Sequence, residues 1–446
     1  MDTLADPTAF PEARCAVADT IFALASGTGR AAVAVMRLSG PGTGKILAAL
    51  CRLPPPRRAS LRRLRARDGE TLDQALVLWL PAPASYTGED CGELFLHGGH
   101  AVIEAVSDAL LALGARPAEP GEFTRRAFLN GRMDLLEAEA IADLVEAETE
   151  AQRRQALRQL EGELGALYRG WAASLRRLLA NEEVAIDFSD QDLPDIAAKI
   201  ADRAALETLH AEIATHLADA RRGERVLAGL SIVVAGPPNA GKSSLINALA
   251  GRDVAIVAPT PGTTRDAIET RIVLAGLPVT LIDTAGLRES ADPVEAEGVR
   301  RARARAADAD LVLAVTDCSA PAPFTLDATA PVLAVANKSD LAPPPDGEKL
   351  AVSALTGAGL EELRTRLAGF VDTLTRAAGP PPLTRARHRA ALGEAASSLA
   401  AALAAPAPEL RAEELRLALA ALGRITGSVG VEDILDTIFS SFCIGK

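Results

Sequence analysis

Apolar residues in the first 130 positions come in short runs separated by glycine, proline and polar residues. Short runs of this kind, bounded by turn-forming residues, are typical of strands. The last run is followed by a longer stretch with apolar residues at helical spacing. We therefore expect a mixed α/β N-terminal part, with strands over 31–38, 75–80 and 93–97 and a helix over 102–113.

The pattern changes after Gly131. Residues 133–185 are rich in Ala, Leu, Glu and Arg, contain few helix-breaking residues, and repeat their apolar positions every three or four residues. The same pattern returns twice later in the chain. It predicts an all-α region, with further helices over 196–222, 384–404, 408–424 and 431–440.

Between the two helical stretches, short apolar runs alternate with helical segments, as in a doubly wound α/β domain. The predicted strands cover 231–235, 279–283, 311–315 and 332–336. Because the helical composition is the same on both sides, we expect this α/β domain to be inserted into one helical domain. The predicted parts are an N-terminal α/β domain over 1–131, helical segments over 132–229 and 372–446, and the inserted domain over 230–371.

Charge argues against a general nucleic-acid binder. The chain has 47 basic and 59 acidic residues, a formal charge of −12, whereas affinity for phosphate backbones comes largely from Lys and Arg. A role with RNA would need a local basic patch or a basic partner. Two Arg-rich stretches exist, over 57–67 and 300–305, although solvated loop or helix faces are the usual explanation of such runs.

Cysteine usage and hydropathy point to a cytoplasmic protein. The five cysteines are scattered and form no C-x-x-C pair, so neither a disulfide framework nor a zinc site is predicted. No apolar run reaches the length of a membrane span, and the acidic N-terminus does not have the pattern of a signal peptide.

The strongest chemical signal is the stretch 236–244, Gly-Pro-Pro-Asn-Ala-Gly-Lys-Ser-Ser. It has the pattern GxxxxGKS between a predicted strand and a predicted helix, the context that a phosphate-binding loop requires. Its glycines let the backbone wrap a phosphate, and the helix N-terminus adds positive potential. Lys242 is expected to reach the outer phosphates and Ser243 to ligate Mg²⁺.

Further motifs indicate that the bound nucleotide carries guanine. Asn337-Lys338-Ser339-Asp340 follows a predicted strand, and Asp340 can accept hydrogen bonds from the ring N–H and the amine of guanine, which adenine does not offer. The stretch 353–355, Ser-Ala-Leu, follows as a second base loop, and 283–286, Asp-Thr-Ala-Gly, precedes both. In this order the motifs predict a GTPase domain.

The hydrolytic residues are less clear from the motifs. Asp283 could reach Mg²⁺ through water, the N–H of Gly286 could bind the γ-phosphate, and Thr264 in a switch loop could complete the Mg²⁺ shell. Leu287 stands where many GTPases have a glutamine that orients water. Another polar group must do this, and the residues alone leave Glu289 and Glu295 both open.

The last residues, Phe-Ser-Ser-Phe-Cys-Ile-Gly-Lys over 439–446, are unusually apolar for a chain end and suggest a docked tail. Cys443 then has two interpretations, a working thiol or a buried small apolar residue. Side-chain chemistry alone favours the buried residue.

Several stretches together resemble the MnmE (TrmE) family of tRNA-modifying GTPases. The resemblance rests on the phosphate loop, Gly-Thr-Thr-Arg-Asp over 262–266, Asp-Thr-Ala-Gly-Leu-Arg over 283–288 and the terminal Cys-Ile-Gly-Lys. Two N-terminal stretches, over 86–90 and 120–130, match as well. The resemblance covers the chain after about its first dozen residues.

The resemblance implies a partner and a one-carbon donor. The family acts with MnmG, an FAD protein that uses NADH, in a heterotetramer or larger complex that adds an aminomethyl-type or carboxymethylaminomethyl group to C5 of the wobble uridine of certain tRNAs. The carbon comes from 5,10-methylene-tetrahydrofolate, for which 5-formyl-tetrahydrofolate is an analogue. The N-terminal domain binds the folate and forms the homodimer. The matching folate residues are Arg37, Glu93, Arg132, where the family usually has lysine, and Lys446.

The resemblance also implies a K⁺-dependent GTPase in which two G domains meet. The matching K⁺ ligands are Asn239, Ala258, Thr260 and Thr263, and Mg²⁺ is held by Ser243 and Thr264. Glu295 matches the glutamate that orients water, and Cys443 matches a functional cysteine, so the catalytic set becomes Lys242, Glu295 and Cys443. The GTP contacts are expected from Asn239, Ala240, Gly241, Lys242, Ser243, Ser244, Ala258, Thr260, Thr263, Thr264, Asp283, Thr284, Ala285, Gly286, Asn337, Lys338, Asp340, Ser353, Ala354 and Leu355.

Two other functions compete with a GTPase subunit of tRNA modification. One is a ribosome-assembly switch with the same core motifs, which would be expected to have a basic tail or an RNA module. The other is a folate-dependent transferase in which GTP is only regulatory.

Overall fold

The structure is a computed structural model of the chain that describes residues 19–27, 29–187, 196–218, 221–251, 269–283, 309–320, 329–344, 350–375, 382–430, 432–440 and 442–445. Its contacts divide the chain into two compact units. Unit 1 comprises 1–142, 160–206 and 397–446, and unit 2 comprises 143–159 and 207–396.

Unit 1 begins with a six-stranded sheet in the order β3-β4-β5-β2-β1-β6. All neighbouring strands are antiparallel except β1 and β6. Burial alternates along β2, β4 and β5 because successive strand side chains point to opposite faces. The elements are β1 Ile21–Leu24, β2 Val33–Ser39, α1 Thr43–Leu50, β3 Ser60–Arg65, β4 Thr71–Leu80, β5 Cys91–His97, α2 His100–Ala112 and β6 Arg116–Pro117.

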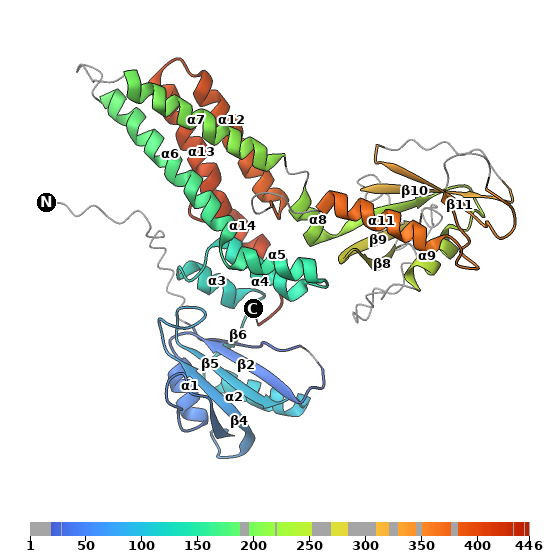
Figure 1. The fold of residues 1–446 in the computed structure, drawn as a ribbon. Helices are drawn as coiled ribbons and strands as arrows, with labels where there is room; N and C mark the ends of the chain where they lie inside the picture. The colour runs from blue at the N-terminus through green and yellow to red at the C-terminus, as the bar shows by residue number, and fades with distance from the viewer. Residues whose placement is uncertain are drawn as a thin grey trace, which may run out of the picture. The chain divides into compact units, whose positions relative to one another are not determined.

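Both α1 and α2 cover the same face of this sheet (Figure 1). Met36, Leu94 and Val77 point to that face and are fully buried against the two helices. Their sequence neighbours point to the opposite face because successive strand side chains alternate. On that opposite face lie the exposed Val33 and Leu76.

The helical part of unit 1 is built around the long helices α6 (Glu163–Asp187) and α13 (Pro408–Thr426), which pack against each other. The buried positions of α6 are spaced by four and three residues, the stripe expected of a packed helix. They are Leu164, Tyr168, Trp171, Leu175 and Leu178, and Gly165 beside the first is buried as well. Two shorter helices, α3 Glu122–Leu129 and α14 Glu432–Ser440, and most of α4 Leu135–Glu146 complete the unit.

Unit 2 contains a second six-stranded sheet, in the order β12-β11-β10-β7-β9-β8. Five strands are parallel and β8 is antiparallel to β9. Its elements are α5 Glu150–Leu160, α8 Arg222–Ala228, β7 Leu230–Ala235, α9 Lys242–Ala250, β8 Glu269–Leu274, β9 Leu277–Asp283, β10 Leu311–Asp317, β11 Val332–Asn337, β12 Leu350–Ala351 and α11 Leu360–Thr375. The two remaining helices, α7 Ile196–Leu217 and α12 Ala386–Ala404, contribute residues to both units.

The core of the second sheet lies between its strands and the helices α9 and α11. Central strands such as β7 are buried on both faces, as expected of a parallel sheet. After β7 the chain forms β8 and β9 on one side of that strand and then crosses to β10 on the other. Ligands bind at such a reversal, outside the carboxyl ends of the strands, so the end of β7 is the expected site.

The predicted fold class is confirmed: an α/β N-terminal domain, a helical domain and a doubly wound α/β domain are all present. Most of the predicted strands and helices agree within a few residues. The sequence pattern missed several shorter elements, among them β1, α1, β3 and α3. The predicted domain boundaries stay a prediction.

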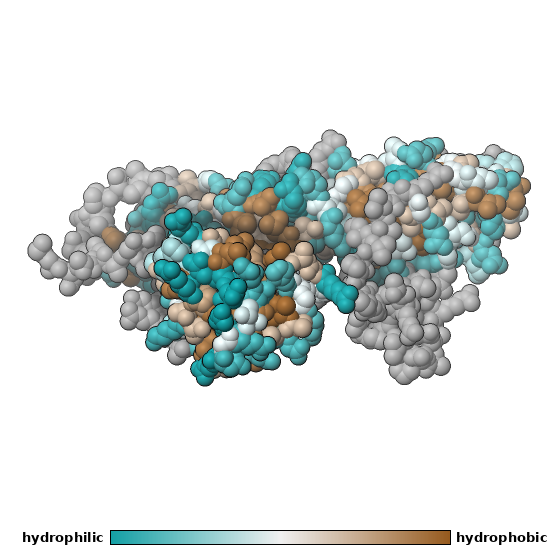
Figure 2. Space-filling model, turned by 90° about the horizontal axis from the view of Figure 1, so that it is seen from below, coloured by the Kyte–Doolittle hydropathy of each residue, from teal (hydrophilic) through white to brown (hydrophobic). Residues whose placement is uncertain are grey.

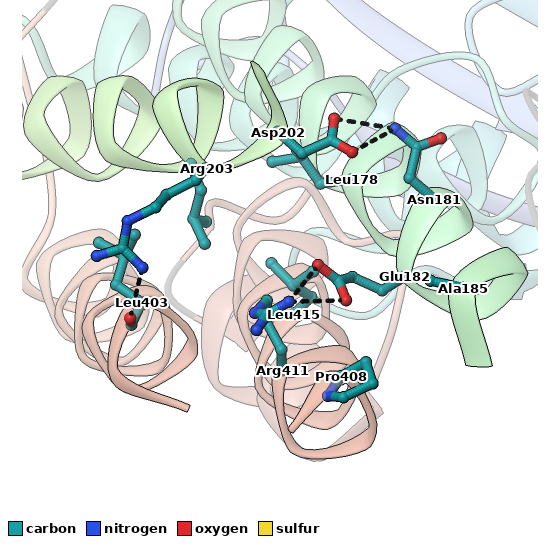
Figure 3. Close-up of a pocket in the computed structure, with 11 residues that line it drawn as sticks. Leu178, Asn181, Glu182, Ala185, Asp202, Arg203, Leu403, Pro408, Arg411 and Leu415 are labelled. Carbon is teal, nitrogen blue, oxygen red and sulfur yellow. Dashed lines mark hydrogen bonds and ion pairs between the residues drawn. The ribbon is translucent and has the colours of Figure 1, made fainter. Parts of the chain in front are cut away.

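A cavity of about 340 Å³ lies between α6, α7, α12 and α13 (Figure 3). Its charged side chains bond to their neighbours, since Arg411 donates to Glu182 at 2.9 Å and Asn181 donates to Asp202 at 3.0 Å. None of the predicted site residues lines it. Within the described ranges, no helix is both long and apolar enough to span a membrane.

Candidate functional site

The predicted phosphate loop lies between the end of β7 and the start of α9. Gly236 passes so close to β10 that a Cβ there would lie 2.1 Å from the carbonyl oxygen of Val315. Gly241 has a φ of +82° and precedes the first helical residue. Glycine is required at both positions, and together they turn the backbone back toward the helix N-terminus. The resulting geometry is that of an anion-binding loop.

Lys242 is the first residue of α9, and its side chain returns over the loop. Its Nζ donates to the carbonyl oxygens of Gly236 and Pro237, each at 3.0 Å. The residue is buried, so the ammonium is held inside the curve of the loop. A phosphate oxygen is the natural replacement for these carbonyl acceptors, because it offers a full negative charge.

Ser243 and Asp283 meet beside the phosphate loop. The Ser243 hydroxyl donates to Oδ2 of Asp283, the last residue of β9. These two oxygens are hard ligands of the type that Mg²⁺ prefers. No cluster of three or more His, Cys, Asp or Glu side chains suited to a metal occurs in the described parts of the chain. Mg²⁺ sites of nucleotide enzymes use one or two protein oxygens together with phosphate and water.

The predicted base loops come together at the ends of β11 and β12. Oδ1 of the exposed Asp340 accepts a hydrogen bond from the hydroxyl of Ser353 at 2.5 Å. The Ser353 hydroxyl also accepts from the backbone N–H of Thr356 at 3.1 Å. The carboxylate is therefore oriented by the second base loop.

Lys338, between Asn337 and Ser339, forms an ion pair with Asp317. The distance from Nζ to Oδ2 is 2.6 Å, and Asp317 is the last residue of β10. Burial opposes ionisation of this carboxyl, but hydrogen bonds from Lys338 and Ser319 outweigh it and lower the pKa of Asp317 to about 2. The ion pair holds the Lys338 side chain against the end of β10.

The N-terminal candidates Arg37 and Glu93 face each other across β2 and β5. Nη2 of Arg37 lies 3.0 Å from Oε1 of Glu93. The guanidinium also lies over two aromatic rings, 5.2 Å from the centre of Tyr86 and 5.8 Å from that of Phe123. The pair lies on the sheet face that α1 and α2 leave open.

Arg132 lies close to the turn at Gly88. A Cβ at Gly88 would be 3.3 Å from two carbon atoms of the Arg132 side chain. Gly88 belongs to the loop 86–90, which begins at Tyr86. The hydroxyl groups of Tyr86 and Thr124 share a hydrogen bond of 2.8 Å. Arg37, Glu93 and Arg132 are thus grouped around one loop.

A buried ion network contacts that loop through Glu89. The guanidinium of Arg126 is almost fully buried and contacts three carboxylates, with distances of 2.9 Å to Asp19, 3.1 Å to Glu89 and 2.8 Å to Glu122. Arg116 contacts two of the same acids, Asp19 and Glu122. Burial raises the pKa of Asp19 and Glu122, but the arginine hydrogen bonds outweigh it, so both pKa values lie below their usual range.

The C-terminal tail is docked, as predicted. Phe442 is buried with its ring centre 5.4 Å from that of Phe439, in a cluster with Phe128. A Cβ at Gly445 would lie 2.4 Å from the carbonyl oxygen of Leu24, so the tail runs beside β1. The alternative that Cys443 is a buried apolar residue is wrong, because its side chain is exposed. The neighbouring Phe442 takes the buried position instead.

The predicted switch and tail residues lie outside the described residues. These are Ala258, Thr260, Thr263, Thr264, Thr284, Ala285, Gly286, Glu289, Glu295 and Lys446, together with Leu287 and the Arg-rich stretch 300–305.

Three groups of residues near the sites were missed from the sequence. Asp317 could have been found, because it ends a strand that is expected to neighbour Asn337 in the sheet. Tyr86 and Phe123 lie in the stretches that match the family, but nothing in their spacing predicts contact with Arg37. The ion network joins Asp19 to Arg126 across 107 positions, which no local pattern reveals.

Family models match two parts of the chain. The model described as the GTP-binding protein TrmE N-terminus matches residues 20–132, and that of the MnmE helical domain matches residues 135–443. The chain is 59% identical to a tRNA modification GTPase MnmE of Gluconacetobacter diazotrophicus, over 96% of this chain and 98% of that protein. It is 57% identical to one of Granulibacter bethesdensis, over 96% and 99%. Among solved structures, the G domain of the T. maritima FeoB iron transporter is 28% identical and covers 32% of this chain and 98% of its own, with a TM-score of 0.24.

Proposed function

The chain belongs to the family of tRNA modification GTPases named MnmE, and we propose the following role for each of its parts. We propose that unit 2 binds and hydrolyses GTP with Mg²⁺ and K⁺. We propose that the N-terminal domain binds a tetrahydrofolate and that the docked tail presents a thiol to the same reaction. The ribosome-assembly alternative is set aside by the family.

The observation that best supports the GTP site is the convergence of Lys242, Ser243 and Asp283 at the end of β7 and β9. In the proposal, phosphate oxygens take the place of the carbonyl groups that now accept from Lys242. Residues 239–244 wrap the phosphates with their backbone N–H groups, and Thr284, Ala285 and Gly286 face the γ-phosphate. Asp340 accepts from the N–H groups of guanine, and Ser353, Ala354 and Leu355 border the base.

The Mg²⁺ site is proposed to use Ser243 and Thr264, with Asp283 acting through water. The donor set supports this, because the Ser243 hydroxyl and the Asp283 carboxylate already lie within hydrogen-bond distance. When bound, the ion supplies positive charge to the β- and γ-phosphate oxygens. Ser243 has to give up its hydrogen bond to Asp283 and turn its oxygen lone pair toward the metal.

Asn239 is the proposed K⁺ ligand within the phosphate loop, joined by Ala258, Thr260 and Thr263. It is exposed and adopts a φ of +61°, so it stands at the outer bend of the loop. A monovalent cation there would add positive charge where other GTPases use an arginine finger. Glu295 is proposed to orient the attacking water, because Leu287 offers no polar group.

Hydrolysis in different salts tests this part of the proposal. The chain should hydrolyse GTP faster in KCl than in NaCl at equal ionic strength. The Asn239→Ala variant should lose most of the difference while it keeps its affinity for GDP. Equal rates in the two salts for the unchanged chain would contradict the cation-dependent mechanism.

The folate site is proposed around Arg37, Glu93 and Arg132, with Lys446 completing it from the tail. A reduced pterin has an amide N–H and an exocyclic amine, which the carboxylate of Glu93 is suited to accept, and a flat ring that can lie against Tyr86. Arg37 holds the Glu93 carboxylate in place through its ion pair, and the glutamyl carboxylates of a folate suit Arg132. When bound, 5,10-methylene-tetrahydrofolate supplies one carbon at the oxidation level of formaldehyde.

A homodimer through the N-terminal domain is proposed from the open face of its sheet. Leu61 and Leu76 are cross-strand partners on this face and are 57% and 45% exposed. Figure 2 looks onto the N-terminal domain and shows apolar patches between polar ones on its surface. Because Arg37 and Glu93 share the face with these leucines, a second copy would also cover the folate site.

The full reaction is proposed to need an FAD-containing partner, MnmG, in a heterotetramer or larger complex in the cytoplasm. The product is an aminomethyl-type or carboxymethylaminomethyl group on C5 of the wobble uridine. Cys443 is proposed to act as a thiol in this chemistry, and its exposure beside β1 supports access to the substrates.

Mass spectrometry of tRNA from cells that lack the chain tests the modification. The wobble uridine should lose its C5 group, and a plasmid copy of the chain should restore it. The Arg37→Ala variant should fail to restore it while its GTP hydrolysis remains intact. A normally modified wobble uridine in cells that lack the chain would exclude the proposal.

The Glu295→Ala variant tests the alternative in which the chain is a folate-dependent transferase and GTP is only regulatory. Loss of the modified uridine in a variant that still binds GTP would show that hydrolysis itself is needed.

A further inference from the structure

A basic patch lies at the edge of the N-terminal sheet, around β3. Between Cys51 and Arg67 the chain has seven arginines and no acidic residue, although its formal charge is −12. Six of these arginines are exposed, and Arg62 is partly exposed. We name this group the β3 patch, and its members are Arg52, Arg57, Arg58, Arg62, Arg63, Arg65 and Arg67.

The charge of the β3 patch is not neutralised by acids within the described residues. Arg57, Arg62 and Arg65 donate only to backbone carbonyl oxygens, such as that of Gly69 from Arg65 at 2.9 Å. None of the seven guanidinium groups forms an ion pair with a described acid. Elsewhere, exposed arginines do pair, as Arg153 and Arg154 do with Glu150 at 2.7 and 2.8 Å.

Protection of the sheet edge does not account for the patch. An edge strand needs only a few charged side chains to prevent pairing with another strand. The strand β3 extends from Ser60 to Arg65, whereas Arg52, Arg57 and Arg58 precede it and Arg67 follows it. Most of the excess charge therefore lies off the hydrogen-bonding edge.

From this uncompensated charge we infer that the β3 patch is a docking surface for the phosphate backbone of tRNA. This inference rests on the proposed function, because it takes the tRNA substrate as the partner. In a chain that is otherwise acidic, a local positive field steers a polyanion to one orientation. The patch contacts phosphates and not bases, so it should position the tRNA without selecting its sequence.

Binding through phosphate contacts has a characteristic dependence on salt. Each neutralised phosphate contributes about 0.7 to 0.9 to the slope of log K against log salt concentration. If Arg52, Arg58 and Arg67, which lie outside the strand β3, each contact one phosphate, their removal should lower the slope by about two to three units. Their side chains form no hydrogen bond within the described residues, so glutamine at these positions should not disturb the fold.

The test compares two triple variants of the full chain that lose the same charge. The patch variant is Arg52→Gln, Arg58→Gln and Arg67→Gln. The control is Arg153→Gln, Arg154→Gln and Arg416→Gln, whose arginines are exposed and already paired with acids. Affinity for unmodified tRNA is measured by fluorescence anisotropy between about 20 and 200 mM NaCl, together with GTP hydrolysis and molecular mass.

We expect the patch variant to bind tRNA at least tenfold more weakly at 100 mM NaCl, with the smaller slope, and the control to match the unchanged chain. Equal affinity and slope in all three proteins, or no measurable binding by the unchanged chain at 20 mM NaCl, would overturn the inference. Weaker binding with a fall in mass to the monomer would also overturn it and assign the arginines to a contact between two copies.

The modification assay separates this inference from the proposed function. If the unchanged chain does not restore the wobble modification in cells that lack it, the proposed function fails. If it does restore the modification but the patch variant binds tRNA normally, only the docking surface is wrong.

Discussion

The carboxamide of Asn337 donates to the carbonyl oxygen of Ala240 at 2.9 Å. Its own oxygen accepts from the backbone N–H of Ala354 at 3.1 Å. One fully buried side chain therefore joins the phosphate loop to both base loops. The position of the phosphates and the position of the base are coupled through this amide.

Replacement of Asn337 by alanine should weaken nucleotide binding at least tenfold. The change leaves the buried carbonyl of Ala240 and the partly buried N–H of Ala354 without their partner, and an unsatisfied buried group costs about 1 to 3 kcal/mol. Titration with a fluorescent GDP analogue measures the effect. Ser339→Ala in the same loop is the matched control and should bind GDP normally. Equal affinity in the two variants would show that the loops hold their geometry without the amide.

The ion pair between Asp317 and Lys338 makes stability depend on pH in the acid range. The pKa of Asp317 is about 2 in the folded chain, below its ordinary value of 3.8. The folded chain thus binds this proton more weakly than the unfolded chain does. The stabilisation is complete above pH 3.8 and is lost as the pH falls toward 2.

Asp317→Asn should therefore lower the melting temperature at neutral pH and flatten its fall between pH 4 and pH 2. Circular dichroism at a series of pH values measures both. Asp108→Asn on the exposed side of α2 removes the same charge and should keep the steep acid limb. If Asp317→Asn keeps that limb too, the pair does not contribute to acid stability.

Sequence patterns located the GTPase motifs because each motif is local. A phosphate loop needs a strand, glycines and a helix within about 20 residues, and all of them are visible in the order of the chain. The long, amphipathic α6 and α13 could be found for the same reason, since their buried positions repeat regularly. The short β1, with only four residues, offers too few positions for any period to be recognised.

Contacts between distant segments could not be predicted in this way. Arg126 meets Asp19 and Glu89 only after the sheet and α3 have formed, and a charged residue in a sequence is expected to be exposed. The exposure of Cys443 depends likewise on which tail residue packs into the cluster with Phe128 and Phe439. Phe442 does so, and one step along the chain turns the cysteine outward.

The buried Arg126 should be among the most sensitive positions of the N-terminal domain. Its removal in Arg126→Met leaves Asp19, Glu89 and Glu122 close together with less positive charge, which costs about 3 to 5 kcal/mol. Arg125→Met is the matched control, because its ion pair with Asp436 is exposed and is worth about 0 to 1 kcal/mol. Hydrogen exchange should show lost protection in the first sheet for Arg126→Met alone, and equal protection in both variants would contradict a structural role of the network.

The docked tail should depend on Phe442 more than on any other described tail residue. Replacing a buried phenylalanine by alanine costs about 3 to 5 kcal/mol, more than a short terminal segment has available, so the tail should detach while the rest of the chain stays folded. Hydrogen exchange over residues 439–445 should then rise to the rate of a free peptide, and the wobble modification should fall although GTP hydrolysis persists. Ile444→Ala removes a side chain that is 60% exposed and should leave both unchanged. Retained protection in Phe442→Ala would mean that contacts such as that of Gly445 with Leu24 hold the tail without the aromatic ring.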